Sequence, residues 1–343
     1  MAFLDFLHLA ADHSNLSAEQ ALEAMSLILE GQATTAQIAA FLVALRMKGE
    51  TSDEIYGFAR AMRDKSVRVD PGPSGCPMVD TCGTGGDGSG TFNISTVVAF
   101  VVAGTGVKVA KHGNRSVSSQ CGSADILEAL GTRITVTPQQ MGECIRDIGI
   151  GFLFAPALHP AMRYAQPARL ELKMRTAFNL LGPLTNPAGA EYQLIGAPSD
   201  RAAELMANAL ARLEVERAFV VHGSDGLDEI TTTGPSLLYE VCRGSATPRT
   251  VTPDDFGLPI SRIEDFKVSG REESAAVIRQ ILKGGPGPAR NIVLANSAAA
   301  LVACGAAPDF RTAVELAAQS IDSRSALGKL ESLARYTQSL PVA

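Results

Sequence analysis

Apolar residues recur at helical spacing over residues 1–66, which predicts amphipathic helices. Each predicted helix starts with a hydroxyl side chain and an acceptor three residues later, as in Ser17–Gln20, Thr34–Gln37 and Thr51–Glu54. Two apolar stripes follow, made of Leu22, Met25, Ile28 and Leu29 and of Ile38, Phe41, Leu42 and Leu45. We therefore expect a small helical domain over residues 1–70.

The segment Asp70–Pro77 contains three prolines and two glycines, so it predicts a connector between two domains. After it, short apolar runs alternate with helix-length segments, which is typical of a mostly parallel sheet covered on both faces. The runs that we predict as strands are Val107–Ala110, Gly151–Ala155, Gln193–Ala197, Ala218–His222 and Asn291–Ala295. We expect an α/β domain over residues 71–343, with helices from about 164–182 returning to the helical domain.

Local capping chemistry marks further helix ends within this second domain. Thr137–Gln140 combines an N-cap threonine, a proline at the first helical position and a capping-box glutamine. Gly131 stands where the preceding helix needs a left-handed residue. Ser123 is predicted at the N-cap of that helix, where its hydroxyl could cap the helix or bind a ligand.

Charge and cysteine content exclude several classes of protein. Lys and Arg number 30 against 36 Asp and Glu, a net charge of -6, so we expect no nucleic-acid partner. The longest nearly uncharged apolar run, Val97–Val107, is too short to span a membrane, and we expect a cytoplasmic protein. The cysteines form no C-x-x-C pair and are interpreted as reduced and without zinc; they are Cys76, Cys82, Cys121, Cys144, Cys242 and Cys304. For Cys82 and Cys121, in the glycine-rich segments, packing or incidental placement is favoured over a nucleophilic role.

A glycine-rich loop follows the first strand-like run. Five glycines lie within Gly83–Gly90, directly before the predicted helix Ile94–Ala103. Backbone amides in such a loop can approach an anion, and the helix start adds partial positive charge, so the order favours a phosphate or diphosphate site. The spacing matches neither the dinucleotide-binding nor the P-loop pattern. Asp87 would repel phosphates unless a sugar hydroxyl or a metal lies between them. The alternative to a phosphate site is that the whole segment is a flexible surface loop.

Two further polar segments follow strands of the predicted sheet. Lys111–Ser119 concentrates cations, an amide and hydroxyls after the strand Val107–Ala110, so it should face the same crevice as the glycine loop unless it is a solvated loop. Asp228 and Glu229 follow the strand that ends at His222 and offer two carboxylates from one turn, which suits Mg²⁺. An acidic surface turn is the alternative, and His222 is interpreted as a strand-end residue rather than a ligand.

Taken together, these segments resemble the anthranilate phosphoribosyltransferase family over nearly the whole chain. The stretch Arg175–Pro187 adds the most specific match. The resemblance implies a helical domain beside an α/β domain, paired as a homodimer through the helical domains. It also implies transfer of the phosphoribosyl group of 5-phosphoribosyl 1-diphosphate (PRPP) to anthranilate with Mg²⁺ and release of diphosphate, the second step of the tryptophan branch.

The resemblance also implies site residues. The PRPP-binding set is Gly83, Gly86, Asp87, Thr91, Asn93, Ile94, Ser95, Thr96, Lys111, His112, Gly113, Asn114, Arg115, Ser116, Val117, Ser118, Ser119 and Ser123. Anthranilate would contact Gly83, Asn114 and Arg169, although Arg169 on its own would be an ordinary surface cation. Two Mg²⁺ ions are expected, one on Ser95 and Glu229 and one on Asp228 and Glu229. Lys111, Asp228 and Glu229 are the expected catalytic residues.

Two rival functions would use part of the same residues. A nucleoside phosphorylase of the same fold would attack the ribosyl carbon with phosphate, but it has no use for a pair of Mg²⁺ ions, and the Lys111 loop lacks the Lys-His-Ser pattern of those enzymes. A catalytically silent relative that binds nucleic acid is disfavoured by the acidic net charge and by the retained Asp228–Glu229 pair.

Overall fold

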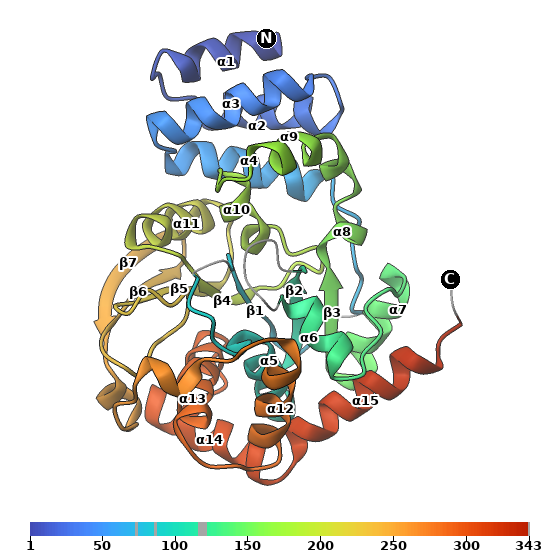
Figure 1. Ribbon diagram of the computed structural model, residues 1–343, viewed down its shortest axis with the longest axis vertical. Coiled ribbons are helices and arrows are strands. Elements are labelled where there is room, and N and C mark those ends of the chain that lie inside the picture. Colours follow the sequence, from blue (N-terminus) through green and yellow to red (C-terminus); the bar gives the residue numbers. More distant parts are fainter. Residues whose placement is uncertain (73–74, 86–87, 116–121, 342–343) are drawn as a thin grey trace.

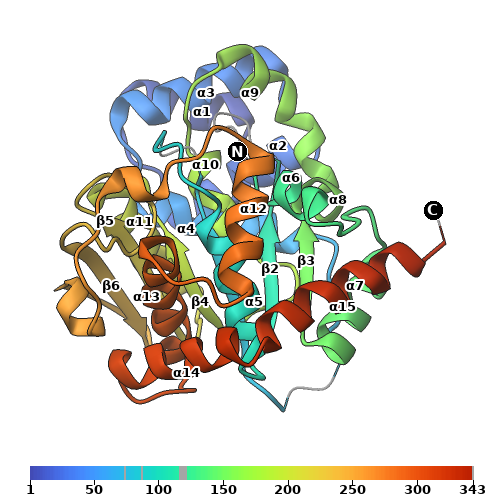
Figure 2. The same cartoon turned by 60° about the horizontal axis from the view of Figure 1, so that its bottom comes forward.

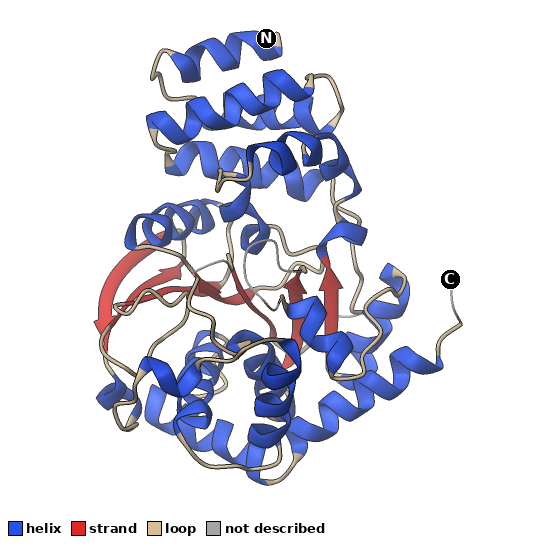
Figure 3. Cartoon of the chain, viewed as in Figure 1, coloured by secondary structure: helices blue, strands red, loops and turns tan. Residues whose placement is uncertain are grey.

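The computed structural model describes residues 1–72, 75–85, 88–115 and 122–341. A layer of helices lies over the carboxyl end of a twisted sheet, and further helices cover both faces of that sheet (Figure 1, Figure 3). The predicted class, a small helical domain with a larger α/β domain, is confirmed. Of the residues implied as PRPP contacts, Gly86, Asp87, Ser116, Val117, Ser118 and Ser119 lie outside the described residues, as does Cys121.

The helical part begins with four helices, α1 (Phe3–Ala11), α2 (Ala18–Leu29), α3 (Thr35–Lys48) and α4 (Ser52–Asp64). The predicted N-caps of α2, α3 and α4 are confirmed, because Ser17, Thr34 and Thr51 each accept a hydrogen bond from the backbone N–H three residues on, at 3.2, 3.3 and 3.3 Å. The 3-10 helix Pro160–Tyr164 contacts α2, α9 (Gln166–Leu172) packs on α3, and α10 (Phe178–Leu181) packs on α4. The later segment is thus built into the helical layer.

The sheet has seven strands in the order β3-β2-β1-β4-β5-β6-β7. Their bounds are β1 (Met78–Gly83), β2 (Lys108–Gly113), β3 (Ile150–Phe154), β4 (Tyr192–Gly196), β5 (Arg217–Gly223), β6 (Ser236–Cys242) and β7 (Ser245–Val251). All pairs from β3 to β5 are parallel, whereas β6 and β7 are antiparallel. The chain leaves β1 toward β2 and β3 and later returns to β4 on the other side, so β1 and β4 flank the point where the strand order reverses.

Helices fill the rest of the α/β part. They are α5 (Ile94–Gly104), α6 (Ser123–Ala129), α7 (Pro138–Glu143), α8 (Ala155–Leu158), α11 (Asp200–Arg212), α12 (Arg271–Leu282), α13 (Pro288–Ala303), α14 (Phe310–Asp322) and α15 (Ser325–Ser339). Helices α5 and α13 pack on one face of the sheet with α12, α14 and α15 outside them (Figure 2), and α11 packs on β5, β6 and β7 from the other face.

Alternate strand residues enter two different apolar cores. Phe219 and Val221 of β5 face the core shared with α5 and α13, whereas Ala218 and Val220 face the core that α11 shares with the helical part. This alternation is the period-two pattern of a strand buried on both faces. The core of the helical part is therefore continuous with one face of the sheet.

One strand prediction is wrong. Asn291–Ala295 belongs to α13, which begins at Pro288 in the first helical position and continues through alanine and leucine to Ala303. A short buried apolar run has no periodicity that separates a strand from one turn of a buried helix, and here the helix-forming residues that follow decide the matter. The β6–β7 hairpin has no counterpart among the predicted strands. Strand β6 mixes buried and partly buried positions, whereas β7 is exposed along most of its length at the sheet edge.

Two capping predictions around α6 have different outcomes. Gly131 has φ 96°, so the predicted left-handed residue is confirmed, and Thr137 caps α7 by accepting from the Gln140 N–H at 3.2 Å. Ser123 is not the N-cap of α6. Gly122 holds that position, and its N–H is bonded instead by the Asp125 carboxylate at 3.1 Å. The Ser123 hydroxyl is consequently not needed to cap the helix.

Candidate functional site

The candidate site lies where β1 and β4 end side by side, with Gly83 paired to Gly196. The turn that carries Asp228 rests directly on these two glycines. A Cβ at Gly196 would come within 1.7 Å of the Asp228 carbonyl oxygen, and one at Gly83 within 2.8 Å of Asp228 Oδ2. Any other residue at Gly196 would force the turn away from the sheet. Open parallel sheets bind ligands at such a reversal of strand order.

The glycine loop begins at the same strand end. The Gly85 N–H donates to Asp228 Oδ2 at 2.9 Å, and Gly85 itself has φ 63°, a left-handed conformation that favours glycine. From the other side the Arg175 guanidinium donates to the Gly85 carbonyl at 2.7 Å. The structure therefore joins the predicted glycine loop to the predicted acidic turn, and adds Arg175, whose role the sequence did not indicate.

The far end of the glycine loop is tied to the segment before α12. The Phe92 N–H donates to the Phe266 carbonyl at 3.0 Å, and the Val268 N–H donates to the Gly90 carbonyl at 2.9 Å. Thr91 forms a bridge with Lys267, and its hydroxyl lies 3.1 Å from that of Ser89. These contacts fix where the chain enters α5.

The start of α5 carries four of the predicted PRPP contacts. Asn93 is the N-cap and accepts from the Thr96 N–H at 3.1 Å, and the Ser95 hydroxyl donates to the Asn93 side-chain oxygen at 3.4 Å. Ile94 and Thr96 are buried. Of this set, Asn93 and Ser95 are partly exposed and carry polar side-chain atoms.

Lys111 of β2 lies under these loops with its side chain almost fully buried, at 2% exposure. Its Nζ donates to the Thr81 carbonyl at 2.5 Å and to the Ser95 hydroxyl at 3.1 Å. Burial lowers the pKa of Lys111, and the negative charges of Asp80, Glu229 and Asp228 oppose that shift. The ammonium therefore lies within the electrostatic reach of the acidic turn and holds Ser95 beside it.

Asp80 is a buried carboxylate in β1 that the sequence did not single out. It accepts from the His112 N–H at 3.0 Å and from the Asn186 side-chain amide at 2.8 Å. Burial raises the pKa of Asp80 to about 6, against the hydrogen bond from Asn186 and the charge of Lys111. An acidic residue inside an apolar strand run was the available signal, but its partner Asn186 is distant in sequence.

His112 follows Lys111 in β2 and lies beside His159, with ring centroids 5.2 Å apart. Its Nδ1 donates to the Gly182 carbonyl at 3.0 Å. Burial lowers the pKa of His112 to about 3 and that of His159 to about 4. In the part of the chain that the structure describes, Nε2 of each ring is buried and has no hydrogen-bond partner. Both rings are neutral near pH 7.

The residues after β2 lie against α6. A Cβ at Gly113 would come within 3.2 Å of the Ser123 side chain, and the Asn114 carbonyl accepts from the Ala124 N–H at 3.2 Å. The structure thus places Asn114 and Ser123 near one another. Arg115 is used differently, because its exposed guanidinium pairs with Asp125 at 2.9 Å and with Glu128 at 2.6 Å. The hydrogen bonds that Arg115 donates to these carboxylates raise its pKa.

Arg169 lies on α9, in the helical layer above the strand ends (Figure 1). Its guanidinium carbon is 5.2 Å from the centroid of the Phe178 ring on α10. Burial lowers the pKa of Arg169, so this arginine is not an ordinary surface cation. The described contacts join it to Phe178, and not to Asn114.

The acidic turn itself is firmly held. Asp225 accepts from the hydroxyls of Thr231 and Thr233 at 2.6 and 2.7 Å, and the Gly223 N–H donates to the Leu227 carbonyl at 2.8 Å. His222, near the end of β5, donates from Nδ1 to the Ala197 carbonyl at 2.9 Å. No group of three or more His, Cys, Asp or Glu side chains is suited to a metal among the described residues. Asp228, Glu229 and Ser95 nevertheless carry hard oxygen donors of the kind that suits Mg²⁺ when water and phosphate complete the shell.

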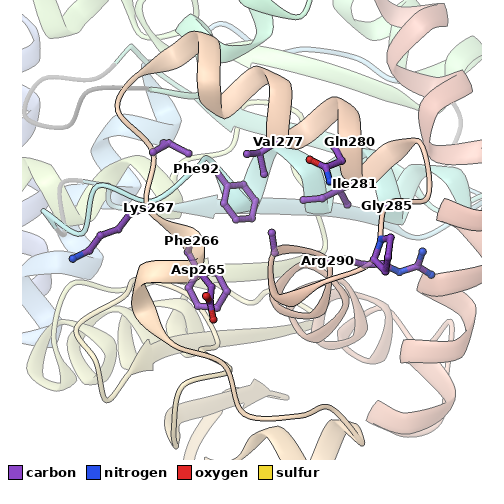
Figure 4. Close-up of a pocket in the computed structure, with 12 residues that line it drawn as sticks. Phe92, Asp265, Phe266, Lys267, Val277, Gln280, Ile281, Gly285 and Arg290 are labelled. Atoms are coloured by element: carbon purple, nitrogen blue, oxygen red, sulfur yellow. The ribbon is translucent and has the colours of Figure 1, made fainter.

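A separate cavity lies behind the end of the glycine loop. It has a volume of about 200 Å³ and is lined by Phe92, Phe266, Ile281 and Arg290, among others (Figure 4). The Arg290 guanidinium is already paired with both oxygens of Asp322, at 2.7 and 2.9 Å. The cavity contains none of the predicted site residues and is distinct from the candidate site.

No helix of the described residues has both the length and the apolar character needed to cross a membrane. The cysteines that the structure describes, Cys76, Cys82, Cys144, Cys242 and Cys304, are free thiols, as predicted. Burial raises the pKa of Cys82, which makes a nucleophilic thiolate unfavourable there.

Family models match both parts of the chain. Residues 75–327 match the "Glycosyl transferase family, a/b domain" and residues 4–66 match the "Glycosyl transferase family, helical bundle domain". The chain therefore belongs to the class of glycosyl transferases that combine a helical bundle domain with an α/β domain.

Individual relatives narrow the family further. The chain is 56% identical over 339 residues to the anthranilate phosphoribosyltransferase of Solibacter usitatus, covering 99% of this chain and 100% of that one. The crystal structure of the Thermus thermophilus anthranilate phosphoribosyltransferase superposes with a TM-score of 0.91 at 42% identity, covering 98% and 100% of the two chains. The Saccharomyces cerevisiae enzyme in complex with PRPP and Mg superposes with a TM-score of 0.89 at 27% identity, covering 98% of each chain. The chain belongs to the anthranilate phosphoribosyltransferase family.

Proposed function

We propose that this chain transfers the 5-phosphoribosyl group of PRPP to the amine of anthranilate and releases diphosphate, as the second step of the tryptophan branch. One observation carries the proposal beyond family membership. At the ends of β1 and β4 the Gly85 amide is bonded to Asp228, and the buried Lys111 ammonium lies under the charges of Asp228 and Glu229. Backbone donors, a cation and two carboxylates at one edge suit a sugar diphosphate with a divalent ion.

In the proposed reaction the bond between ribose C1 and the diphosphate oxygen breaks, and its electron pair leaves with diphosphate. A bond forms between C1 and the anthranilate nitrogen, which loses one proton to solvent. Attack on the face opposite the leaving group inverts C1. An aromatic amine is unprotonated near neutral pH, so the protein contributes mainly orientation and electrostatics.

The residues have separate proposed roles around PRPP. Lys111 holds the Ser95 hydroxyl and would supply positive charge under the glycine loop, whose remaining amides would serve the phosphates. Ser95 and Glu229 would hold one Mg²⁺, and Asp228 with Glu229 a second. When bound, Mg²⁺ neutralises charge that develops on the departing diphosphate. The wider proposed PRPP set, including the residues outside the described ranges, is the one given above from the resemblance.

We propose that anthranilate binds between the loops and the helical layer, on Gly83, Asn114 and Arg169. The partly desolvated Arg169 guanidinium supports this role, because a guanidinium matches a carboxylate with two parallel hydrogen bonds. The benzoate carboxylate would then lie on the α9 side and the amine toward ribose C1.

We also propose a homodimer through the helical domain. Large apolar side chains are exposed on neighbouring helices there, with Leu4 at 44%, Met47 at 74% and Leu170 at 57% exposure on α1, α3 and α9. A self-complementary apolar surface suits a two-fold interface. A domain boundary near residues 70 and 71 and a cytoplasmic location, supported by the free thiols, complete the proposal.

The test is an assay with PRPP, Mg²⁺ and anthranilate that follows loss of anthranilate fluorescence. We expect turnover only when all three are present. Turnover of a nucleoside with inorganic phosphate, and none with PRPP and anthranilate, would instead identify a phosphorylase.

Replacing both Asp228 and Glu229 by Ala tests the metal assignment. We expect turnover at saturating Mg²⁺ to fall by about 100-fold or more, because stabilisation of the leaving group is lost. The exposed adjacent pair Asp254 and Asp255, replaced in the same way, is the matched control and should leave turnover unchanged. Near-normal activity of the Asp228/Glu229 variant would refute the assignment.

A further inference from the structure

The turn that carries Asp228 and Glu229 is clamped by a single side chain from α13. The Asn296 side-chain oxygen accepts from the Ile230 N–H at 2.9 Å, and its amide nitrogen donates to the Ile230 carbonyl at 2.8 Å. Asn296 thus bonds both backbone polar groups of the residue that directly follows Glu229. The pattern is the one that a neighbouring strand would offer to an extended residue.

The clamp lies in the interior of the protein. Asn296 is fully buried, and Ile230 is 1% exposed. Without Asn296 both polar groups of Ile230 would lose these partners in an apolar setting, which costs far more than the same loss at the surface. The turn therefore has a strong reason to stay where Asn296 holds it.

The position of the asparagine amide is itself fixed. Its nitrogen also donates to the Ile292 carbonyl one turn earlier in α13, at 2.9 Å, so both amide hydrogens and the oxygen are bonded. Helix α13 in turn packs on β4, β5 and α5. Through α13, the turn is therefore held against β4, which carries Gly196, and against α5, which carries Ser95.

We propose that Asn296 is a positioning residue for the acidic turn, which sets the place of the Asp228 and Glu229 carboxylates and so the affinity for PRPP with Mg²⁺. The inference rests on the proposed function. Partners that orient metal-binding carboxylates, without touching the metal, change its affinity by about 10- to 100-fold when they are removed. The hydrogen bonds of Asn296 join it to Ile230 and Ile292, so its proposed effect on the carboxylates is transmitted through Ile230.

The next residue of α13 provides a matched control. Ser297 is also fully buried, but in the described part of the chain its hydroxyl has no hydrogen-bond partner. Ser297→Ala therefore changes a buried polar residue in the same helix turn without touching the acidic turn. We expect it to leave both substrate binding and folding close to those of the unchanged protein.

The experiment is calorimetric titration of the full-length protein with PRPP in the presence of Mg²⁺ and without anthranilate, so that binding is measured apart from turnover. Asn296→Leu keeps the size of the side chain and removes the clamp. We expect its affinity for PRPP with Mg²⁺ to fall by about 10- to 100-fold and its Mg²⁺ requirement to rise. The KM for anthranilate should stay as in the unchanged protein.

Circular dichroism and thermal unfolding separate positioning from a general loss of structure. If Asn296→Leu does not fold, Asn296→Ala is measured instead, because it also removes the clamp but leaves room for water to bond the Ile230 backbone groups. A loss of PRPP affinity in the same direction is then expected. A folded Asn296 variant that binds PRPP and Mg²⁺ as tightly as the unchanged protein would overturn the inference. Failure of the unchanged protein to bind PRPP would instead overturn the proposed function.

Discussion

Lys48 in the helical layer and Lys111 at the strand ends both have side chains that are almost entirely out of water, at 3% and 2% exposure. Lys48 Nζ is bonded to the Glu54 carboxylate at 2.9 Å, the Asn15 side chain at 3.0 Å and the Gly49 carbonyl at 2.9 Å. Each of its three hydrogens thus has an acceptor, one of them an ion-pair partner. This lysine is part of the helical layer's own structure.

Lys111 is surrounded differently. Its hydrogen bonds go to a backbone carbonyl and to the Ser95 hydroxyl, and no carboxylate of the described residues forms an ion pair with it. The nearby carboxylates act on it only through longer-range charge. A cation kept out of water without a paired carboxylate is destabilising by itself, and such a cost is the pattern expected of a functional residue. The comparison therefore supports the proposed role of Lys111.

The largest effect should come from the structural lysine. Lys48→Met leaves the Glu54 carboxylate buried without its cation, and we expect a loss of about 3–5 kcal/mol in the free energy of unfolding. Denaturant unfolding monitored by circular dichroism measures this change. The KM values of the folded fraction for PRPP and for anthranilate should match those of the unchanged protein. A changed KM for PRPP would contradict the assignment of Lys48 to structure alone.

Lys111→Met should have the opposite profile. In the proposed reaction the Lys111 ammonium stabilises the departing diphosphate, so we expect kcat to fall by about 100- to 1000-fold. The unfolding free energy should change little, since the penalty for burying the ammonium disappears with it. Steady-state kinetics and denaturant unfolding on the same preparation check both parts. A variant that unfolds easily but turns over normally would assign Lys111 to structure.

The pH dependence of stability tests whether His159 is neutral in the folded chain. Its ring lies beside that of His112, which follows Lys111 in β2. The pKa of His159 is about 4 in the folded chain against 6.5 ordinarily. Between these values the unfolded chain binds a proton at His159 that the folded chain does not, so this residue alone lowers stability by roughly 3 kcal/mol as the pH falls from 6.5 to 4. His112, with a pKa of about 3, adds to the fall, and Asp80, with a pKa of about 6 against 3.8 ordinarily, opposes it. We expect His159→Gln to flatten this fall in unfolding measurements across that range. An unchanged pH profile would contradict the neutral buried ring.

The smallest effect compares two helix caps. Thr51 caps α4 beside Glu54, and Asn93 caps α5 beside Ser95. Each replacement by Ala should cost about 1 kcal/mol of unfolding free energy. Only Asn93→Ala should also raise the KM for PRPP, and kinetics on the two variants measure that difference. If Thr51→Ala and Asn93→Ala had the same KM for PRPP, Asn93 would not be a PRPP contact.

Much of the local structure could be predicted because its causes lie within a few residues. The caps at Ser17, Thr34 and Thr51 each need only an acceptor three residues on, and the glycine loop is visible as a composition change directly after a strand. The same locality explains the errors. Nothing within the run Asn291–Ala295 indicates whether it packs as a strand or as a buried helix. Gly122 takes the cap position of α6 because the Asp125 carboxylate accepts from its N–H.

The supporting polar residues could not be predicted for the opposite reason. Asn296 and Ile230 are 66 positions apart, and Asn186 and Asp80 are 106 apart, so no local pattern pairs them. The sequence shows such residues as isolated polar positions in apolar segments. The roles assigned to the predicted site residues stay predictions until the assays above are done.

The apolar core shared by the helical layer and one face of the sheet has a consequence for how this protein can be handled. Helix α4 lies on α11, and α11 covers strands β5, β6 and β7. A fragment that ends after α4 would expose to water the apolar surface of α4 that α11 normally covers. The remaining piece would expose the apolar surface of α11 that α4 normally covers. Splitting the chain at the proline-rich connector should therefore yield two insoluble halves, although that connector is the natural place for a cloning boundary.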